Sequence, residues 1–361
     1  MKSTTSLRST QTAGPAYNLR TEMRTADFDY QLPLERIAQS ASEPRDHSRL
    51  LVISRSTGSL EHRRFDEIVD YLRPGDLVVC NDSRVIPARL VGHKVNGGGK
   101  VELLLLRRLE QGVWETLAKP GRRLKEGTKV VIGLEPAIEA QVMARNEAGT
   151  FIVELADEEA LERAGSVPLP PYIHLPLDDA ERYQTVYART KGSVAAPTAG
   201  LHFTSRLMGR LRDNDVRFVF VTLHLALDSF RPVKVDDPQE HKIHSEYCEL
   251  GVEAAGELSR ARAEGRRVVC VGTSAVRVVE HAAGLGGDGV TPFAGWTDLF
   301  ILPGHRFRVV DALITNFHLP RSTLLMLVSA FAGKEPMLRT YMEAIRLGYR
   351  FYSFGDAMLI L

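Results

Sequence analysis

The sequence predicts a mixed α/β fold, in which a large α/β domain with a mostly parallel, barrel-like sheet carries an inserted small antiparallel β-barrel. Two observations lead to this prediction. Between residues 85 and 166, short apolar runs follow one another with turn residues and no helical pattern between them, which is typical of a small barrel or sandwich. After residue 167, strand-like apolar runs alternate with helical patterns, which indicates parallel strands covered by helices.

The length of the chain suits two domains. Its 361 residues exceed what one small core needs, and we place the α/β domain at residues 25–84 and 167–361 and the barrel at residues 85–166. Residues 1–24 are rich in Ser and Thr, with Glu22 as their only acid. We expect these residues to form a disordered extension, although a transit peptide has a similar composition.

Periodicity and turn residues place the elements of the first half. Phe65–Leu72 has apolar residues at helical spacing and ends before Pro74, while Leu77–Cys80 has the uniform apolarity of a buried strand. The expected barrel strands are Val85–Lys94, Val101–Leu109, Val113–Ala118, Lys129–Ile132, Ala137–Ala144 and Thr150–Leu155.

Beyond a Pro-rich linker at Val167–Pro171, strands and helices alternate. We expect strands at Arg217–Leu225, Arg267–Val271 and Val309–Ile314, and a last strand within Arg350–Leu361. We expect helices at Ser205–Leu211, Val252–Ala263, Ser274–Ala282, Ser322–Ala332 and Pro336–Leu347.

Composition limits the class of protein. No stretch holds about 18 uncharged apolar residues, so we expect no membrane span. The three cysteines, Cys80, Cys248 and Cys270, form no CxxC pair, and we expect buried, reduced thiols in a cytoplasmic protein. Lys and Arg total 46 against 45 for Asp and Glu, so a nucleic-acid surface would have to come from local clusters of charge.

Two such clusters stand out. Basic side chains flank a turn in the expected barrel, with Arg107 and Arg108 nearby, and four arginines crowd the end of one expected helix. The first cluster comprises Lys119, Arg122, Arg123 and Lys125, and the second comprises Arg260, Arg262, Arg266 and Arg267. Each is either a solvated face or a contact for phosphates.

Polar residues that adjoin apolar strands are candidates for a site, because ligands of open α/β folds bind at the carboxyl ends of strands. Asp82 and Arg84 follow the expected Leu77–Cys80 strand, although an Asx-turn would explain them equally well. Polar residues in comparable places are Asp311, Asn316, His318 and Asp356.

Two further segments could contact a ligand. Ala195–Thr204 is poor in charge and contains Thr198 and His202. Because small residues let a backbone approach a ligand closely, it is either part of a site or a packed loop with a hydrogen-bonded histidine. Val271–Ser274 links a strand to a helix, and the N–H groups at that helix start, near Thr273, could hold an anion.

Histidines in the middle of the α/β half suggest acid–base chemistry. The Arg217–Leu225 strand delivers His224, and Asp228, Arg231, His244 and Glu246 follow it. The His-x-x-His-x-Glu spacing at 241–246 could bind a metal, but the metalloprotease pattern, with the Glu between histidines four apart, is absent. We therefore expect no metal and favour general acid–base use. The residues alone leave the reaction unknown.

Longer strings of residues resemble one family, the S-adenosylmethionine:tRNA ribosyltransferase-isomerases of queuosine biosynthesis. The resemblance spans about residue 28 to the C-terminus. Its strings are Tyr30–Gln39, Arg45–Val52, Gly75–Leu90, Tyr183–Tyr187, Val194–Thr204, Phe230–Val233, His244–Glu246, Asp311–Pro320, Ser322–Phe331 and Gly355–Ile360. The chain departs from the family at Leu225 and Ala226, where Val and Gly are usual, and at Ser274 and Ala275, where Thr and Ser are usual.

The resemblance implies the substrates and the reaction. The ribosyl part of S-adenosylmethionine would be transferred to 7-aminomethyl-7-deazaguanine at the wobble position of a tRNA with a GUN anticodon. Its rearrangement would give epoxyqueuosine, with release of adenine and methionine. S-adenosylmethionine would be consumed as a ribosyl donor, and no metal, membrane or obligate protein partner is implied. We expect a cytoplasmic monomer.

The resemblance also suggests roles for the candidate residues. A sulfonium acidifies the adjacent carbon, so a base must remove its proton, and the candidate bases are His202, His224, His244 and His318. Asp82 or Glu246 would take a proton from the aminomethyl group. Asp228 suits the ammonium of the methionine part, and Arg231, Arg277 or the helix start at Thr273 suits its carboxylate.

The remaining candidates bind substrate without a chemical role. Arg84, Thr198, Asp311, Asn316 and Asp356 are candidates for contacting the donor or the base. Lys119, Arg122, Arg123 and Lys125 are candidates for contacting tRNA phosphates. Tyr183, Tyr187 and Phe203 could stack on a splayed-out base, or pack in the core.

Two alternative functions stay open. A methyltransferase would use the same donor, but the chain lacks a glycine-rich loop after a first strand with an acidic residue behind it. A non-catalytic RNA-binding protein would rely on the barrel alone, but it would not need the polar strings of the α/β half.

Overall fold

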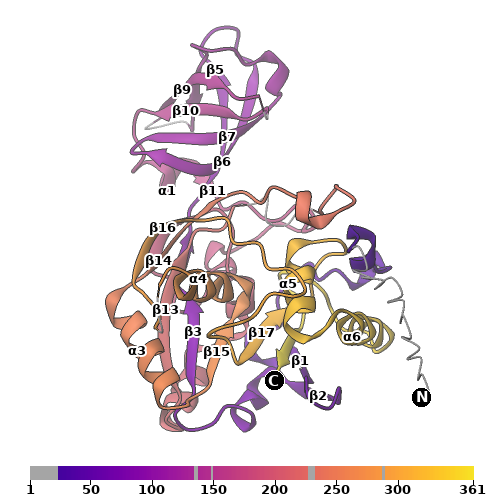
Figure 1. Ribbon diagram of the computed structural model, residues 1–361. Coiled ribbons are helices and arrows are strands. Elements are labelled where there is room, and N and C mark those ends of the chain that lie inside the picture. Colours follow the sequence, from indigo (N-terminus) through magenta and orange to yellow (C-terminus); the bar gives the residue numbers. More distant parts are fainter. Residues whose placement is uncertain (1–22, 134–136, 148, 227–231, 287–288) are drawn as a thin grey trace, which may run out of the picture.

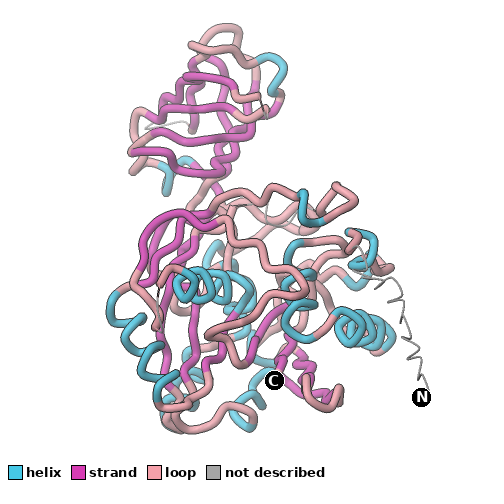
Figure 2. The backbone as a smooth tube through the Cα atoms, in the orientation of Figure 1, coloured by secondary structure: helices cyan, strands magenta, loops and turns pink. Residues whose placement is uncertain are grey.

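Figure 1 shows the protein as a computed structural model, which describes residues 23–133, 137–147, 149–226, 232–286 and 289–361. A small barrel stands on a larger main domain, which consists of a wide sheet with helices on both faces. Long loops cover the part of the main domain that faces the barrel (Figure 2).

Nine strands of the described residues form the sheet of the main domain, in the order β16-β14-β13-β3-β15-β17-β18-β1-β2. Their bounds are β1 (Arg49–Ile53), β2 (Leu60–Arg64), β3 (Leu77–Asn81), β13 (Arg217–Leu223), β14 (Glu246–Leu250), β15 (Val268–Val271), β16 (Phe293–Thr297), β17 (Ala312–Asn316) and β18 (Ala357–Ile360). The central strands β13, β3, β15 and β17 are parallel to one another. The carboxyl ends of these four strands therefore meet at one edge.

The sheet corrects one part of the predicted architecture. Antiparallel strands flank the parallel centre, since β14 and β16 extend one side, β18 runs against β17, and β2 pairs antiparallel with β1. The sheet is therefore mixed rather than mostly parallel. The described residues contain no pairing between the end strands β16 and β2, so the expected barrel-like closure is not confirmed.

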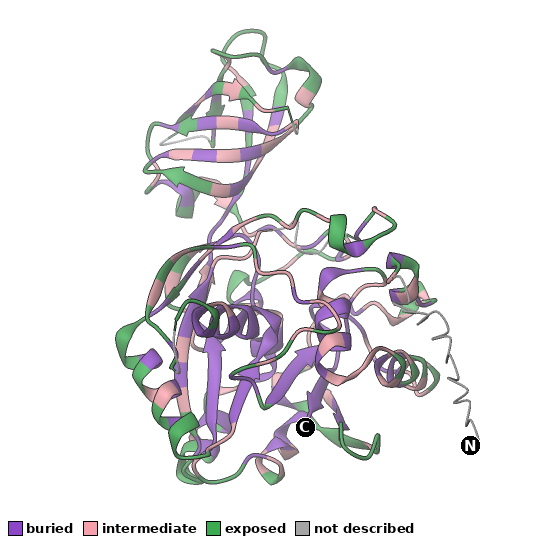
Figure 3. Ribbon diagram, in the orientation of Figure 1, coloured by how far each residue is buried: buried purple, intermediate pink, exposed green. Residues whose placement is uncertain are grey.

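Apolar side chains alternate between the two faces of the sheet, as the period of two in a strand requires. In β1, Leu51 and Ile53 join the core under the helices α3 to α6, whereas Leu50 and Val52 join a second core with α2. The central strands are buried along their length, while α3 and α6 expose their outer faces (Figure 3). The helices are α2 (Ser205–Asp213), α3 (Val252–Ala263), α4 (Gly272–Gly284), α5 (Thr323–Ala332) and α6 (Lys334–Arg346).

The inserted barrel closes on itself. Six described strands follow the order β5-β6-β7-β10-β9-β8, all neighbouring pairs are antiparallel, and β5 pairs with β8 to complete the circle. The strands are β5 (Arg89–Lys94), β6 (Lys100–Glu110), β7 (Val113–Lys119), β8 (Lys129–Ile132), β9 (Ile138–Arg145) and β10 (Phe151–Leu155). The short helix α1 (Leu161–Ala164) and the strand β11 (Gly165–Ser166) lead back to the main domain, where β4 (Ser83–Val85) pairs with β12 (Thr190–Ser193). The prediction of an antiparallel barrel is confirmed.

Most predicted elements of the second half are confirmed. The structure has α3 at the predicted residues, and α2, α4, α5 and α6 within two or three residues of the predicted ends. The segment at 65–72 differs, because Phe65–Asp70 is a 3₁₀ helix. The edge strands β2 and β16 were not predicted, since β2 is polar and exposed over most of its length and β16 is a short run without alternating polar residues.

Three further expectations concern the cysteines, membrane-spanning helices and the domain boundaries. Cys80, Cys248 and Cys270 are free and buried, as predicted. None of the helices in the described ranges is long and apolar enough to cross a membrane. Most of the expected extension at 1–24 lies outside the described residues, and the domain limits at 25–84, 85–166 and 167–361 stay a prediction.

Candidate functional site

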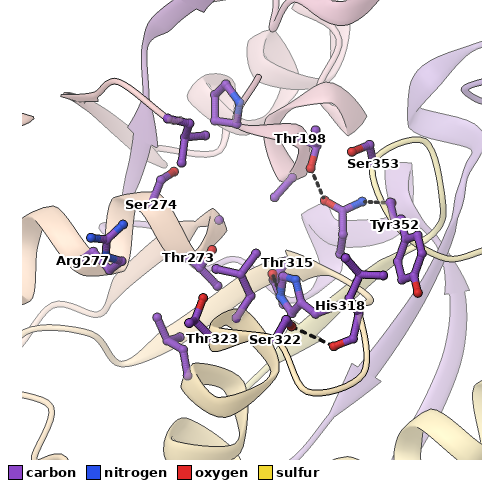
Figure 4. Close-up of a pocket in the computed structure, with 18 of the residues that line it drawn as sticks. Thr198, Thr273, Ser274, Arg277, Thr315, His318, Ser322, Thr323, Tyr352 and Ser353 are labelled. Carbon is purple, nitrogen blue, oxygen red and sulfur yellow. Dashed lines mark hydrogen bonds between the residues drawn. The ribbon is translucent and has the colours of Figure 1, made fainter. Parts of the chain in front are cut away.

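A cleft of the main domain lies where the parallel strands β15 and β17 end. Figure 4 shows its lining, which comes from the start of α4, the segment after β17, the start of α5, and two loops. Together with the solvent at its mouth, the space measures about 910 Å³. This position, outside the carboxyl ends of parallel strands, is where α/β folds bind ligands.

The first turn of α4 opens into this cleft. Gly272 has φ of 85°, a left-handed conformation that a side chain disfavours, and it turns the chain from β15 directly into α4. No side chain caps this helix start, and Gly272, Thr273 and Ser274 line the cleft. Uncapped N–H groups at a helix start carry partial positive charge and attract anions. The predicted link from a strand to a helix start at 271–274 is therefore present, and anion binding there stays a prediction.

Arg277 stands one turn further along α4 and also lines the cleft. Only 5% of its side chain is exposed. Its Nε donates to the carbonyl of Leu299 at 3.0 Å, and its Nη1 pairs with Glu246. Its Nη2 is buried and makes no hydrogen bond with the described residues. A buried N–H donor without an acceptor costs about 1–3 kcal/mol. This nitrogen is therefore suited to donate a hydrogen bond to an anionic group of a ligand.

Asn316, at the end of β17, connects the cleft to His202. The Thr198 hydroxyl donates to Asn316 Oδ1 at 3.3 Å, and Asn316 Nδ2 donates to His202 Nε2 at 3.1 Å. His202 must then carry its proton on Nδ1, which donates to Ser48 Oγ at 2.7 Å. Burial lowers the pKa of His202 to about 3. His202 is thus a neutral, fully hydrogen-bonded group behind the cleft wall.

His318 is the predicted histidine that reaches the cleft itself. It follows β17, and Thr315 Oγ1 lies 2.9 Å from its Nε2. Its backbone is fixed at both ends, because its N–H donates to Tyr341 Oη and its carbonyl accepts from Tyr30 Oη. Burial lowers the pKa of His318 to about 3, which leaves the imidazole neutral near pH 7.

Aromatic side chains complete the cleft, and the sequence did not single them out. Tyr172 and Tyr352 lie with ring centroids 4.8 Å apart, and Tyr172 shares a hydrogen bond with Ser353. Phe300 and Phe317 also line the space. No Asp or Glu occurs among the lining residues that the structure describes. Aromatic faces attract cations, so this wall suits a sulfonium and an adenine ring.

A second cleft lies between the barrel and the main domain, and it contains His224 and Glu246. Burial lowers the pKa of His224 to about 4. Gly192 packs beneath its ring, where an added Cβ would stand 2.7 Å from His224 Nε2. Glu246 Oε1 accepts the N–H of Ala226 at 3.0 Å, while its other oxygen pairs with Arg277. The Glu246–Arg277 pair therefore joins the walls of the two clefts, next to the departure from the family at 225–226.

Five predicted residues line neither cleft, although Ile243 and Ser245, which flank His244, line the first and the second cleft respectively. Asp82 accepts from Thr222 Oγ1 at 2.7 Å and pairs with Arg189, and Arg84 pairs with Glu181. Asp356 accepts the N–H groups of Arg49 and Arg350. Asp311 caps the start of β15, at the opposite edge of the sheet from the first cleft. His244 is exposed at the start of β14, and Asp228 and Arg231 lie outside the described residues.

The predicted surface clusters have different surroundings. Lys119 lies on β7 opposite Glu102 and so belongs to the barrel end away from the main domain, whereas the Glu110–Val113 end borders the second cleft. Arg122 and Arg123 follow in a 3₁₀ turn at that far end. In the other cluster, Arg260 pairs with Glu257, Arg266 with Glu264 and Arg267 with Asp76. These pairs favour a solvated face for the second cluster.

Two of the proposed stacking residues belong to the core. Tyr183 and Phe203 have no exposed surface, and Tyr187 packs against Phe220. An exposed aromatic residue beside the second cleft is instead Trp296, which sequence reasoning missed because the edge strand β16 was not predicted. Within the described ranges, no group of three or more His, Cys, Asp or Glu could hold a metal ion.

Known proteins are similar to this chain over most of its length. The family described as "Queuosine biosynthesis protein" matches residues 25–360. An S-adenosylmethionine:tRNA ribosyltransferase-isomerase of Dehalococcoides mccartyi strain CBDB1 is 57% identical, over 94% of this chain and 100% of the relative. One from Symbiobacterium thermophilum is 52% identical, with the same coverage. The crystal structure of an S-adenosylmethionine tRNA ribosyltransferase from Thermotoga maritima is 42% identical, covers 93% of this chain and 100% of its own, and has a TM-score of 0.55.

Proposed function

The chain belongs to the queuosine biosynthesis protein family, and from this premise we propose that it is an S-adenosylmethionine:tRNA ribosyltransferase-isomerase. It transfers the ribosyl part of S-adenosylmethionine to 7-aminomethyl-7-deazaguanine at the tRNA wobble position and rearranges it to the epoxide of epoxyqueuosine. Adenine and methionine are released. The tRNA carries a GUN anticodon, and the enzyme acts as a cytoplasmic monomer without a metal.

The observation that carries the proposal is the unpaired, buried Nη2 of Arg277 beside the uncapped first turn of α4. Together they form a site for the carboxylate of the methionine part, since charge-assisted hydrogen bonds and a helix start both favour a carboxylate. The aromatic wall with Tyr172 and Tyr352 then lies beside the sulfonium and the adenine. Asp228 stays our candidate partner of the ammonium, outside the described residues.

Among the four candidate histidines, we assign the removal of the proton next to the sulfonium to His318. It lines the same cleft as Arg277, and burial keeps it neutral. His202 positions Asn316 through its Nε2, and His224 faces the second cleft. Glu246 lines that cleft whereas Asp82 does not, so we assign the proton of the aminomethyl group to Glu246.

The products test the reaction directly. The protein is incubated with S-adenosylmethionine and a tRNA that carries 7-aminomethyl-7-deazaguanine, and the small molecules are separated by chromatography. Equal amounts of adenine and methionine are expected, and neither is expected with a tRNA that carries guanine at the same position. Release of S-adenosylhomocysteine would instead identify a methyltransferase and overturn the proposal.

A further inference from the structure

The cleft between the barrel and the main domain has the composition of a site for an unpaired nucleobase. It measures about 1100 Å³ with its solvent, and β6 of the barrel faces β14, β16 and the segment after β13 of the main domain across it. We propose that Trp296 on β16 is the platform on which the target base of the tRNA stacks, and that arginines of β6 hold the flanking phosphates. This inference rests on the proposed function and adds the place and the contacts of the RNA substrate.

Three aromatic rings lie in a row along the main-domain wall. His224 and Tyr247 are nearly parallel, at 20° with centroids 5.8 Å apart, and Tyr247 meets Trp296 edge-on at 5.8 Å. Tyr247 and Trp296 are cross-strand partners of β14 and β16, so the sheet fixes their spacing. Trp296 keeps 46% of its surface exposed. Unpaired RNA bases stack on such exposed aromatic faces, at about 1–3 kcal/mol per base.

The opposite wall supplies positive charge. The guanidinium carbon of Arg107 lies 5.4 Å from the Trp296 ring centroid, so a cation already flanks the platform. Arg107 pairs with Glu115 and Arg108 with Glu158, both through half-exposed guanidinium groups. Exposed ion pairs contribute only about 0–1 kcal/mol, so these arginines can exchange a carboxylate for a phosphate. Arg107 Nε is buried and makes no hydrogen bond with the described residues.

The cleft also adjoins the donor site. Glu246 lines it, while its partner Arg277 lines the cleft assigned to S-adenosylmethionine. Leu225 faces the donor cleft, and the next residue, Ala226, faces the base cleft. A base stacked near Trp296 would therefore lie on one side of the Glu246–Arg277 ion pair, with the donor on the other side. The basic cluster at the far end of the barrel (Lys119, Arg122 and Arg123) does not line the donor cleft. It is suited to bind phosphates elsewhere in the tRNA.

Tryptophan fluorescence can report this contact. It has two tryptophans, and Trp114 is 2% exposed in the barrel core. The probe RNA is an anticodon stem-loop with 7-aminomethyl-7-deazaguanine at the wobble position. Its addition should quench the tryptophan emission of the wild type, because a stacked base quenches indole. The Trp296→Phe variant, which keeps only Trp114, should show no quenching.

Kinetics then separate the base site from the donor site. In Trp296→Ala, the KM for the stem-loop should rise roughly 5- to 100-fold with the KM for S-adenosylmethionine unchanged, and Trp296→Phe should recover most of the loss. Leu285→Ala removes a comparably exposed apolar side chain after α4 and should change neither. A wild-type KM for RNA in Trp296→Ala, or equal quenching in Trp296→Phe, would overturn the inference. Wild-type protein that binds the RNA with Trp296 quenched but releases no adenine would instead refute the proposed function alone.

Discussion

Arg277 is the residue on which the donor site depends. Its Nε donates to the Leu299 carbonyl and its Nη1 pairs with Glu246, so Nη2 is the nitrogen left to bind a ligand in the cleft. Glu246 is itself 3% exposed, so removing the arginine charge would leave a buried carboxylate unpaired, at a cost in stability that hides the effect on binding. A lysine keeps the charge but cannot present a fork of donors.

We therefore predict that Arg277→Lys raises the KM for S-adenosylmethionine roughly 10- to 100-fold, which corresponds to about 1.5–3 kcal/mol for a charge-assisted hydrogen bond. The KM for tRNA should change less than threefold. Steady-state kinetics with each substrate varied in turn measure both values. An unchanged KM for S-adenosylmethionine in a folded variant would remove Arg277 from the carboxylate site.

Two buried histidines and the half-buried His224 make stability depend on pH. Burial lowers the pKa to about 3 for His202 and His318 and to about 4 for His224, whereas an unfolded histidine titrates near 6.5. Between these values the unfolded chain binds protons that the folded protein does not, so stability is lost as pH falls below about 6.5. Each fully buried histidine contributes about 1–2 kcal/mol of this loss by pH 5.

The midpoint of urea unfolding should accordingly be lower at pH 5 than at pH 7.5. His318→Gln is expected to be less stable than wild type at pH 7.5, because it loses the packed ring, yet less sensitive to the change of pH. Identical midpoints of wild type at both values would show that these histidines are protonated in the folded state.

At the residue scale, the sequence predicted part of the site. Asn316 and His318 were selected at a strand end, Thr273 at a helix start, Thr198 in a segment poor in charge, and Arg277 through the family resemblance. All five line the first cleft. Asp82, Asp311 and Asp356 satisfied the same rule, but their carboxylates cap or pair with neighbouring groups. A polar side chain at a strand end can either contact a ligand or cap a nearby backbone group. Only the direction of the side chain in the structure distinguishes the two cases.

At the scale of elements, the junction between β15 and α4 sets the donor site. The strand ends at Val271, and the positive φ of Gly272 lets α4 begin without a loop. The same short junction aims the first turn of the helix and Arg277 into one cleft. A residue with a Cβ would strain this turn.

Gly272→Ala should therefore destabilise the protein by about 1–2 kcal/mol and raise the KM for S-adenosylmethionine. Gly284→Ala is the matched control, since Gly284 ends the same helix with nothing within 4 Å of an added Cβ, and it should leave stability equal or slightly higher. Thermal melting and kinetics measure both. Equal melting temperatures for the two variants would show that φ at 272 carries no strain.

Elements were predicted best where periodicity is strong. The helices α3 and α5 and the barrel strands have clear apolar spacing and turn residues at their ends, and the structure has them at or near the predicted residues. The antiparallel strands β14 and β16 lie on one side of the sheet beside the second cleft. Their burial alternates, but residue polarity does not follow it, because the buried Glu246 begins β14 and the exposed Trp296 lies on β16. Pairing between distant segments, which no local pattern encodes, made these residues into strands and placed Trp296.

For the whole molecule, the barrel extends the surface available to a tRNA. Its near end forms the base cleft, and its far end carries Lys119, Arg122 and Arg123. Net charge is +1, so any attraction to tRNA must come from such local clusters.

Reversing two charges at the far end tests this contact. Arg122→Glu with Arg123→Glu should weaken binding of full-length tRNA and reduce the slope of log K against log salt by roughly one to two. The affinity for a short anticodon stem-loop should change less, because that RNA is held in the base cleft. An unchanged salt slope for full-length tRNA would exclude the far end of the barrel from the interface.

The transfer of the ribosyl unit is the central claim, and mass spectrometry of the tRNA tests it most directly. The tRNA with 7-aminomethyl-7-deazaguanine is incubated with the protein and S-adenosylmethionine labelled with ¹³C in the ribose, then digested to nucleosides. We predict that the modified nucleoside gains all the ribose carbons and none of the methyl carbon. A nucleoside that gains a single unlabelled methyl group, or no mass at all, would contradict the account.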